Sequence, residues 1–430
     1  MTRLTLPSKT ALVLGGGGAK GSYQIGAIAA LEEAGVTCGQ VIGVSIGAIN
    51  AAMYAQRDMV RAGELWDSIR LSDVLTADAL SIAEDAEAIL GQPEKLLEYF
   101  ARNSQKSFAD ISPLKTLLSR HISEEQVRSS PIRMTLTASR FPTLSCVEKK
   151  VSDMEQGSLH QWLLASAAIF PIFPMQTIGE ERYIDGGFCD NTPVEAAIRA
   201  GAQRIIAIDI GKNRSHAQYD RRPNITYIRA SHSLGGLLSF DSETVRRNRI
   251  LGYNDTMRAL GMMRGTRYSF DQIDAQALFS RAQDFIVRLT QIEAALSFNN
   301  ALTKKDAAPL FSLLEEELPS GADAIDYLLR AMELCADVAQ VNPAQVFTFR
   351  TFTGELRARL PLQKAESMLD SLLGGRIGVL FSQPQPDRKL VISCLYHLLL
   401  RENTFSGLAL RTLAAFPREM LCALTLQAIL

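Results

Sequence analysis

The sequence predicts an α/β fold, with a mainly parallel central sheet between layers of helices, followed by an all-helical C-terminal region. Short β-branched runs alternate with helical stretches through the first two thirds of the chain, and glycines follow several of these runs. Beyond about residue 265 strand signals become scarce. Strands separated by helices form βαβ units, whose parallel sheet is covered on both faces. We therefore expect one domain over residues 8–264 and a helical region over residues 265–430.

The expected strands are the short apolar or β-branched runs. They cover residues 11–14, 41–44, 132–138, 145–151, 204–209 and 225–229. Between residues 66 and 130 the pattern becomes helical, with apolar residues three and four apart from Ile82 to Phe100 and a break at Pro93. This segment is either a lid over the strand ends or a set of ordinary crossover helices, and the pattern favours neither.

The region after residue 265 has apolar residues at intervals of three and four, which is the helical period. One set comprises Leu278, Ala282, Phe285, Leu289, Ile292 and Leu296, and another comprises Ile325, Leu328, Leu329, Met332 and Ala336. Residues 391–400 are apolar almost all round, which is typical of a buried helix. These helices form either a structural cap or a surface for membranes or protein partners.

The composition is that of an ordinary globular protein. Of the 430 residues, 47% are hydrophobic and 21% are charged, which excludes bulk disorder. Lys and Arg together number 45 against 46 for Asp and Glu, so the net charge is −1. That balance gives no reason to expect nucleic acid as a partner. The length fits two domains.

The spacing of cysteines and histidines argues against a metal site and a disulfide framework. The six cysteines form no CxxC pair, and the five histidines show no ligand spacing. No calcium loop of the EF-hand type is present either. We expect no metal or other cofactor, and reduced, mostly buried thiols at Cys38, Cys146, Cys189, Cys335, Cys394 and Cys422.

The printed N-terminus has no apolar core after Arg3 of the kind that a secretory signal peptide requires. No run approaches the roughly 18–20 apolar residues that span a bilayer. The expected location is the cytoplasm. Peripheral contact with membranes, and export by a route without a signal peptide, are compatible with the same sequence.

The first glycine-rich motif directly follows the first expected strand. It fits the dinucleotide fingerprint G-x-G-x-x-G, but that function needs an acidic residue after the next strand, which here ends at Ser45. Its lysine lacks the neighbours that a Walker A loop requires. The remaining interpretation is a loop that presents backbone N–H groups to an anion. The loop comprises Gly16, Gly17, Gly18, Ala19, Lys20 and Gly21.

The second motif, Gly43-Val44-Ser45-Ile46-Gly47, has the strand–GxSxG–helix pattern of a nucleophile elbow. Small residues on both sides of Ser45 let the chain turn sharply and expose the hydroxyl. The helix that starts near Ile46 directs its N-terminal dipole at that hydroxyl and favours a developing negative charge. Ser45 is therefore the predicted nucleophile.

The third motif, Asp185-Gly186-Gly187, supplies the predicted base at the end of a short strand. A carboxylate of ordinary pKa is a weak base, so Asp185 has to act within hydrogen-bond reach and in a partly dry pocket. His216 and His232 are the alternatives for a Ser–His–Asp triad, but neither directly follows a strong strand.

Taken together, the three motifs resemble those of the patatin-like phospholipases of bacterial type. GGGAKG, GVSIG and DGG match that family's three signatures in order. Further matches are residues 48–50 after the elbow, residues 165–168 before Pro171, and residues 191–193 after DGG. The resemblance is strong over about residues 8–210 and looser to about residue 256. Ile46 departs from it, since the family often has Ala or Gly there.

The resemblance implies a three-layer α/β/α patatin-like fold and a Ser–Asp dyad without histidine. It makes Ser45 the nucleophile and Asp185 the base, and it makes backbone N–H groups around Gly17 and Gly18 the oxyanion hole. Ile46 adds a further N–H, as in serine hydrolases generally. The implied reaction is hydrolysis of carboxylic esters of phospholipids or related lipids through an acyl-enzyme, without a cofactor.

Other functions fit the same motifs. An acyltransferase or thioesterase would use the same dyad, and a catalytically idle domain would bind a lipid or a protein partner. Idle sites usually lose one of their groups, whereas Ser45, Asp185 and the glycine loop are intact. Lys20 either lies near a lipid phosphate or is solvated. The expected partners are a lipid or acyl-ester substrate and, through it, the membrane surface.

Overall fold

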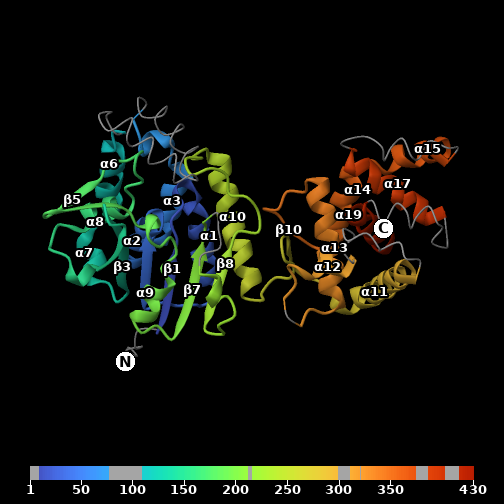
Figure 1. Ribbon diagram of the computed structural model, residues 1–430, viewed down its shortest axis with the longest axis horizontal. Coiled ribbons are helices and arrows are strands. Elements are labelled where there is room, and N and C mark those ends of the chain that lie inside the picture. The colour runs from blue at the N-terminus through green and yellow to red at the C-terminus, as the bar shows by residue number, and fades with distance from the viewer. Residues whose placement is uncertain are drawn as a thin grey trace. The chain divides into compact units, whose positions relative to one another are not determined.

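The computed structural model describes residues 9–76, 109–211, 216–298, 310–319, 321–373, 386–401 and 416–430. The chain divides into two compact units, Met1–Leu260 and Gly261–Leu430 (Figure 1). An eight-stranded sheet with flanking helices forms the first unit, and the second is mainly helical. The predicted α/β fold with a helical C-terminal region is therefore confirmed. The expected helices from Ile82 to Phe100 lie outside the described residues.

The sheet of the first unit has the order β5-β6-β3-β2-β1-β7-β8, with β4 paired to β3. The pairs among β3, β2, β1, β7 and β8 are parallel, whereas β3–β4, β3–β6 and β5–β6 are antiparallel. All six expected strands are present. The strands are β1 (Thr10–Leu14), β2 (Gln40–Val44), β3 (Arg133–Phe141), β4 (Ser145–Lys150), β5 (Gln176–Ile178), β6 (Glu181–Asp185), β7 (Arg204–Asp209) and β8 (Ile225–Arg229).

Helices cover the sheet on both faces. Several begin at a side-chain cap: Asp58, Ser123 and Asp241 each accept an N–H from the first turn that follows, which satisfies a donor that the helix itself leaves unpaired. The helices of the first unit are α1 (Gly21–Glu33), α2 (Ile46–Ala55), α3 (Met59–Ser68), α6 (Ser112–His121), α7 (Glu124–Ser129), α8 (Leu159–Ser166), α9 (Val194–Arg199) and α10 (Ser242–Ala259).

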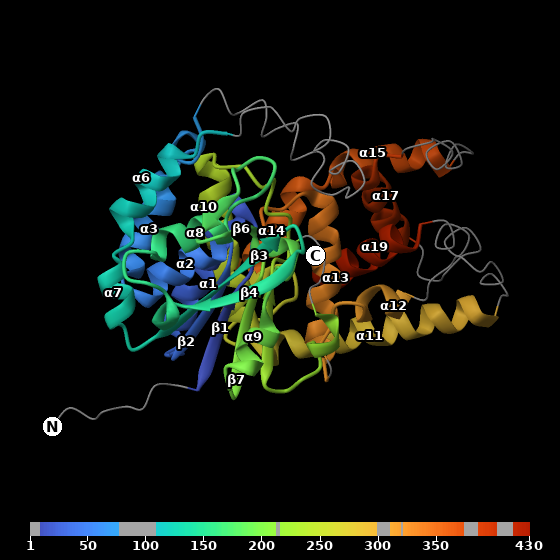
Figure 2. The same ribbon diagram turned by 60° about the vertical axis from the view of Figure 1, so that its left-hand side comes forward.

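The two faces of the sheet are buried by different helices. On one face Val194 of α9 packs with Ala11 and Val13 of β1. Side chains alternate along a strand, so Leu12 and Leu14 point to the opposite face, and both are fully buried. Helices α1, α2, α3 and α10 lie on that side (Figure 2). A sheet buried on both faces explains why its parallel strands read as continuous apolar runs.

The register on β3 brings two strand ends together. Val44, the last residue of β2, pairs with Thr137, and Asp185, the last residue of β6, pairs with Ala138. Since β4 occupies residues 135–140 along one edge of β3, β6 follows β2 along the other edge. The strands run in opposite directions and end at neighbouring positions. Ser45, which follows Val44, therefore lies next to Asp185.

Helices α1 and α10 pack at backbone distance. A Cβ on Gly26 would lie 1.8 Å from the carbonyl oxygen of Arg249, and one on Gly252 would lie 1.9 Å from that of Tyr23. The Tyr23 hydroxyl also donates a hydrogen bond to the buried Asp255 at 2.8 Å. Two glycines in facing helices thus permit the close approach, which fixes the helix that follows the glycine loop.

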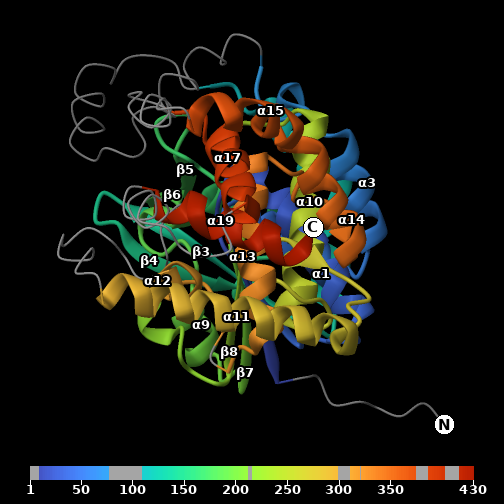
Figure 3. The ribbon, with the colours of Figure 1, turned by 90° about the vertical axis from the view of Figure 1, so that its right-hand side faces the viewer.

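The second unit consists mainly of helices (Figure 3), and its core contains the apolar faces that the helical spacing predicts. The residues of both expected sets that have described side chains are buried, Leu278 to Ile292 in the first and Ile325 to Ala336 in the second. None of the described helices is long and apolar enough to cross a bilayer. The elements are β9 (Ser269–Phe270), α11 (Ala275–Phe298), α12 (Leu310–Glu315), α13 (Ala324–Ala339), β10 (Val346–Phe347), α14 (Phe349–Arg359), α15 (Leu362–Leu373), α17 (Arg388–Arg401) and α19 (Pro417–Ile429).

A buried carboxylate ties the start of the second unit to its helices. Glu333 of α13 is fully buried, and one of its oxygens accepts the backbone N–H groups of Thr266, Arg267 and Tyr268 at 2.8, 3.0 and 3.0 Å. Arg330 lies one helical turn away at 3.5 Å. Hydrogen bonds and an ion pair together satisfy a charge that would otherwise be costly to bury.

The expectation of reduced thiols is wrong for two of the six cysteines. Cys146 of β4 and Cys189, directly after the Asp185 turn, form a disulfide with a Cα–Cα distance of 5.5 Å. The other four are buried thiols, as expected. The two cysteines are 43 residues apart, and they meet only because β4 and β6 both pair with β3. The spacing of the two cysteines in the sequence does not indicate that they form a disulfide.

Replacing both Cys146 and Cys189 by serine should lower the free energy of unfolding by about 4 kcal/mol, because a cross-link closing a loop of 43 residues restricts the unfolded chain. Urea unfolding of the wild type and the double variant measures this. A thiol reductant should destabilise the wild type by a similar amount and leave the double variant unchanged. Equal stability of the two proteins without reductant would contradict the cross-link.

Candidate active site

Ser45 connects β2 to α2 in a backbone conformation that few non-glycine residues adopt. Its φ is 56° and its ψ is −127°, which costs of order 1–3 kcal/mol. Ser45 donates its N–H to the hydroxyl of Ser166 at 2.9 Å, and Ser166 donates in turn to the carbonyl of Thr137 at 2.7 Å. The sharp turn from strand to helix is thus held by hydrogen bonds from α8 and β3, and the serine sits at the N-terminus of α2.

Gly43 and Gly47 permit this turn because neither position has room for a side chain. A Cβ on Gly43 would lie 2.3 Å from the carbonyl oxygen of Gly47, and one on Gly47 would lie 2.2 Å from that of Leu14. The first turn of α2 therefore packs directly on the ends of β1 and β2.

Asp185 is almost fully buried at the end of β6. Its Oδ1 accepts the N–H of Gly187 at 2.7 Å, whereas its Oδ2 has no hydrogen-bond partner of ordinary geometry in the described part of the chain. The Ser45 hydroxyl is near enough to stabilise the charged carboxylate. A carboxylate oxygen without a partner beside a serine hydroxyl is suited to accept the proton of that hydroxyl.

The electrostatics of Asp185 follow from its burial. Loss of contact with water raises the pKa of the Asp185 carboxyl from 3.8 to about 6, against the opposing effect of the Ser45 hydroxyl and the Gly187 N–H. The carboxylate is therefore a stronger base than an exposed one, and it still ionises below neutral pH.

The two glycines after Asp185 keep its turn close to the sheet. A Cβ on Gly186 would lie 2.2 Å from the carbonyl oxygen of Thr137, and one on Gly187 would lie 2.8 Å from Asn191 Oδ1. The DGG motif is thus explained by space: only glycine fits between the carboxylate, β3 and Asn191.

The glycine loop is anchored at both ends by backbone hydrogen bonds. Gly16 donates its N–H to the carbonyl of Asn191 at 3.0 Å, and Ala19 donates to the carbonyl of Leu237 at 2.8 Å. Asn191 also donates its side-chain amide to the carbonyl of Gly16 at 3.1 Å. The segment after DGG therefore holds the loop in place, a role for Asn191 that sequence reasoning did not assign.

The loop between these anchors and the start of α2 carry backbone N–H groups that no acceptor among the described residues engages. In the described part of the chain, no hydrogen bond engages the N–H groups of Gly17, Gly18 or Ile46. Gly18 has a φ of 56°, and a Cβ there would lie 2.3 Å from the carbonyl oxygen of Leu237. The predicted loop and the N-terminus of α2 thus supply donors around Ser45, as an anion site requires.

Lys20 and Gly21 end the loop with different roles. Lys20 lines a cavity together with Ser45 and Asp185. Gly21 makes room for the elbow, since a Cβ there would lie 2.5 Å from Ile46 and 2.8 Å from Trp66. The larger residue after the serine is therefore accommodated by the glycine that ends the loop.

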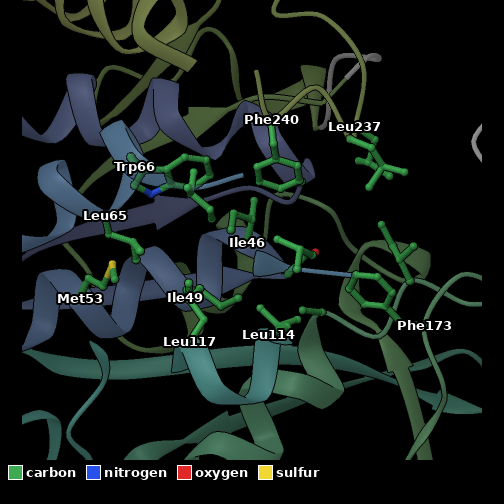
Figure 4. Close-up of a pocket in the computed structure, with 17 residues that line it drawn as sticks. Ile46, Ile49, Met53, Leu65, Trp66, Leu114, Leu117, Phe173, Leu237 and Phe240 are labelled. Atoms are coloured by element: carbon green, nitrogen blue, oxygen red, sulfur yellow. The ribbon is translucent and has the colours of Figure 1, made fainter. Parts of the chain in front are cut away.

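Ser45 lies where two cavities meet. One, with an empty volume of about 690 Å³ including space open to solvent, is lined by 17 residues, of which only Ser45 and Trp66 carry a polar side-chain atom (Figure 4). The other, of about 790 Å³, contains Asp185, Lys20 and Asn191. An apolar group and a polar group can thus lie on either side of the serine.

A buried chain of side-chain hydrogen bonds links the apolar cavity to Gly15, the residue directly before the glycine loop. The Trp66 indole donates to Asn50 Oδ1 at 3.0 Å, Asn50 donates to Gln24 Oε1 at 2.8 Å, and Gln24 donates to the carbonyl of Gly15 at 2.7 Å. Sequence analysis noted Asn50 only within the family match. Nothing in the spacing of Gln24 or Trp66 indicates that they meet.

The histidines considered for a triad lie elsewhere. His216 contacts Asp190 Oδ1 at 2.8 Å, and His232 contacts the Ser231 hydroxyl at 3.1 Å. Neither lines the cavities that contain Ser45. Within the described residues no group of three or more His, Cys, Asp or Glu side chains could hold a metal ion.

Comparison with known proteins agrees with this arrangement. Residues 12–198 match the profile of the family described as "Patatin-like phospholipase". This matched range contains all three glycine-rich motifs. Residues 12–198 therefore form a patatin-like phospholipase domain by this match. The resemblance noted in the sequence is thereby confirmed for the patatin-like domain.

Curated relatives of the patatin-like domain are much longer proteins. The human "Patatin-like phospholipase domain-containing protein 6" is 29% identical over 223 residues, which cover 49% of this chain and 14% of that protein. "Lysophospholipase NTE1" of Yarrowia lipolytica is 27% identical over 223 residues, covering 49% and 13%. The chain thus spans about a seventh of the length of these relatives.

Solved structures show weaker likeness over more of the chain. VipD from Legionella pneumophila aligns with 99% of this chain and 90% of its own, at 15% identity and a TM-score of 0.40. Full-length ExoU from Pseudomonas aeruginosa, solved with full-length SpcU, aligns with 96% of this chain and 88% of its own, at 16% identity and a TM-score of 0.34.

The raised pKa of Asp185 should make wild-type stability depend on pH. Since the fold favours the neutral carboxyl, this contribution to stability is fully present below the unfolded pKa of about 3.9 and is lost as pH rises to about 6. Asp185→Asn stays neutral throughout. Its free energy of unfolding relative to wild type should therefore increase by about 2 kcal/mol from pH 4 to pH 7.

Urea unfolding of both proteins at the two pH values measures this difference. Comparing the proteins at each pH cancels the contributions of all other titrating groups. A difference that stays constant between pH 4 and pH 7 would mean that Asp185 has an ordinary pKa in the folded protein.

Proposed function

We propose that the patatin-like domain is a lipid acyl hydrolase in which Ser45 and Asp185 form a catalytic dyad. The observation that carries this proposal is the register on β3, which ends β2 and β6 at neighbouring positions. The Asp185 carboxylate then lies near the Ser45 hydroxyl, and its Oδ2 has no partner of ordinary geometry among the described residues that would compete for the hydroxyl proton. Burial makes this carboxylate basic enough to act without a histidine.

In the first half of the reaction, Ser45 Oγ attacks the ester carbonyl carbon while Asp185 Oδ2 takes the hydroxyl proton. The carbonyl oxygen becomes an oxyanion and accepts hydrogen bonds from the N–H groups of Gly17 and Gly18, with that of Ile46 at the positive end of α2. The tetrahedral intermediate collapses, and the alcohol leaves with the proton from Asp185. An acyl-enzyme on Ser45 remains.

In the second half, water replaces the alcohol. Asp185 takes a proton from the water as it attacks the acyl carbon, and the same N–H groups stabilise the second oxyanion. Collapse returns the proton to Ser45 and releases a free fatty acid. Every proton transfer uses one carboxylate, and no metal or cofactor takes part in the proposed steps.

Phospholipids and lysophospholipids are the substrate class that we propose. The names of the relatives, a phospholipase domain protein and a lysophospholipase, support it. The apolar cavity suits an acyl chain, and Lys20 in the polar cavity suits a phosphate on the leaving group. Because such substrates reside in membranes or micelles, we expect the domain to act at a lipid surface.

The extent of the hydrolase domain is also part of the proposal. We assign it to residues 8–264, since α10 packs on α1 through Gly26 and Gly252 and so supports the helix that follows the glycine loop. Residues 265–430 then form a separate helical region, whose role at a lipid surface or with a partner is distinct from the chemistry.

The dyad predicts that Ser45→Ala and Asp185→Asn each remove nearly all hydrolysis of a lysophospholipid, and that the double variant is scarcely worse than either single variant, because the two groups act as one unit. In the wild type, kcat/KM should rise with pH through about 6 and level off above it, since only the ionised carboxylate is a base. Fatty-acid release measured by mass spectrometry is the readout.

An organophosphonate should label Ser45 in the wild type, and EDTA should not inhibit. Full activity of Asp185→Asn, with loss on replacing His216 or His232, would overturn the dyad. Transfer of the acyl group to an added alcohol or thiol in place of water would indicate an acyltransferase. Absence of both labelling and turnover over a panel of lipids would indicate a binding module.

The oxyanion hole predicts that Gly18→Ala lowers kcat by about 10²–10³-fold, which is typical for loss of one donor, because the added Cβ displaces the loop from Leu237. Gly35→Ala is the matched control: Gly35 also has a positive φ, 72°, but no atom lies within 4 Å of its Cβ position. The Gly35→Ala substitution adds the strain of a positive φ without any steric contact, so its kcat should not change. Equal losses in both variants would mean that backbone strain, not the hole, is responsible.

A further inference from the structure

Beyond the serine and the backbone donors beside it, the described residues that line the apolar cavity offer no side-chain group for hydrogen bonding. Among the described residues that line it, only Trp66 besides Ser45 carries a polar side-chain atom, and its indole N–H is already donated to Asn50. A polar group that entered this cavity would lose its contacts with water without replacement, which is unfavourable. The cavity therefore accepts hydrocarbon and rejects the head group of a lipid.

Its entrance is defined by the residues that it shares with the polar cavity. Ser45, Ile169 and Leu237 line both, so the two cavities meet at the nucleophile. Figure 4 shows Leu237 and Phe173 at one side, Ile46 near the centre, and Met53 and Leu65 at the opposite side. The far end of the cavity is thus the end at Met53.

One face of α2 forms the floor between these ends. Ile46, Ile49 and Met53 all line the cavity and are three and four residues apart, so they lie on one face of the helix. At 1.5 Å per residue, Ile49 lies about 4.5 Å and Met53 about 10 Å along the helix from Ile46. Each residue thus marks a different depth from the serine.

The wall at the far end is rigid. The Trp66 ring is held by its hydrogen bond to Asn50, and it stacks on Phe240 with ring centroids 6.4 Å apart. Trp66 is 2% exposed and Met53 is also 2% exposed, so neither has solvent to move into. A fixed wall means that the length of a guest is limited by the residues that close the cavity.

We propose that α2 is a ruler for the acyl chain. The chain of the ester enters the apolar cavity with its carbonyl at Ser45 and extends along Ile49 to Met53, which limits the chain length that the enzyme accepts. This inference rests on the proposed hydrolase function. It adds the residues that select the substrate, and it assigns the alcohol part of the ester to the polar cavity.

The test compares hydrolysis of butyryl, octanoyl and hexadecanoyl nitrophenyl esters by wild type, Ile49→Trp and Met53→Trp. For each protein the readout is kcat/KM for a longer ester divided by kcat/KM for the butyryl ester, which cancels general losses of activity. Val60→Trp is the matched control, since Val60 is 76% exposed on α3 and does not line the cavity.

Ile49→Trp should lower both the octanoyl and the hexadecanoyl ratio at least about tenfold, because each methylene excluded from an apolar pocket costs on that order. Met53→Trp should lower the hexadecanoyl ratio as much and leave the octanoyl ratio within about threefold of wild type. Met53→Ala should raise the hexadecanoyl ratio. Val60→Trp should change neither ratio.

Extra volume in a packed core destabilises by about 1–3 kcal/mol, so thermal unfolding has to accompany the kinetics. Ile49→Phe and Met53→Phe add less volume and serve if a tryptophan variant does not fold. Ratios that do not change in any folded variant, or that change equally for Ile49 and Met53, overturn the ruler and leave the hydrolase intact. A wild type that hydrolyses none of the esters and resists phosphonate labelling overturns both.

Discussion

The backbone of Ser45 is the constraint on which the rest of the site depends. A positive φ at a serine persists only where the surroundings enforce it. Here Gly43 and Gly47 let α2 approach the strand ends, and Ser166 accepts the serine N–H. The hydroxyl faces Asp185 because β3 aligns the ends of β2 and β6. Strands far apart in the sequence therefore have to pair before Ser45 lies beside Asp185, and the site is a product of the whole sheet.

Burial acts on this site in two opposite directions. It raises the pKa of Asp185 and so weakens the folded state at neutral pH. The same dry surroundings would strengthen a hydrogen bond from Gly17 or Gly18 to the oxyanion of the proposed reaction. The first unit tolerates the unfavourable part because packing elsewhere is tight. The contact between α1 and α10 at Gly26 and Gly252 is the clearest case, and it also fixes the helix into which the glycine loop leads.

Much of this arrangement could be predicted because its signals are local. Continuous β-branched runs mark strands buried on both faces, and the turn at Ser45 needs glycines at fixed offsets that the sequence displays. What escaped prediction depends on register. Asn191 reaches the loop at Gly16, and Trp66 reaches Gln24 through Asn50, only after separate elements have packed. Their residue types are common, so no periodicity or spacing distinguishes them from ordinary core residues.

The Cys146–Cys189 disulfide lies next to the site and can react with thiols in the surrounding solution. Cys189 follows the turn whose Gly187 N–H is donated to Asp185, and Cys146 is exposed on the edge strand, within reach of a thiol in solution. Exchange with such a thiol would break the Cys146–Cys189 bond next to this turn, without any change in sequence, pH or ligand. Two preparations of this chain, one handled with a reductant and one without, therefore differ chemically at Cys146 and Cys189, next to the turn that holds Asp185. Activities measured on the two preparations can be compared only when it is known whether each was exposed to a thiol.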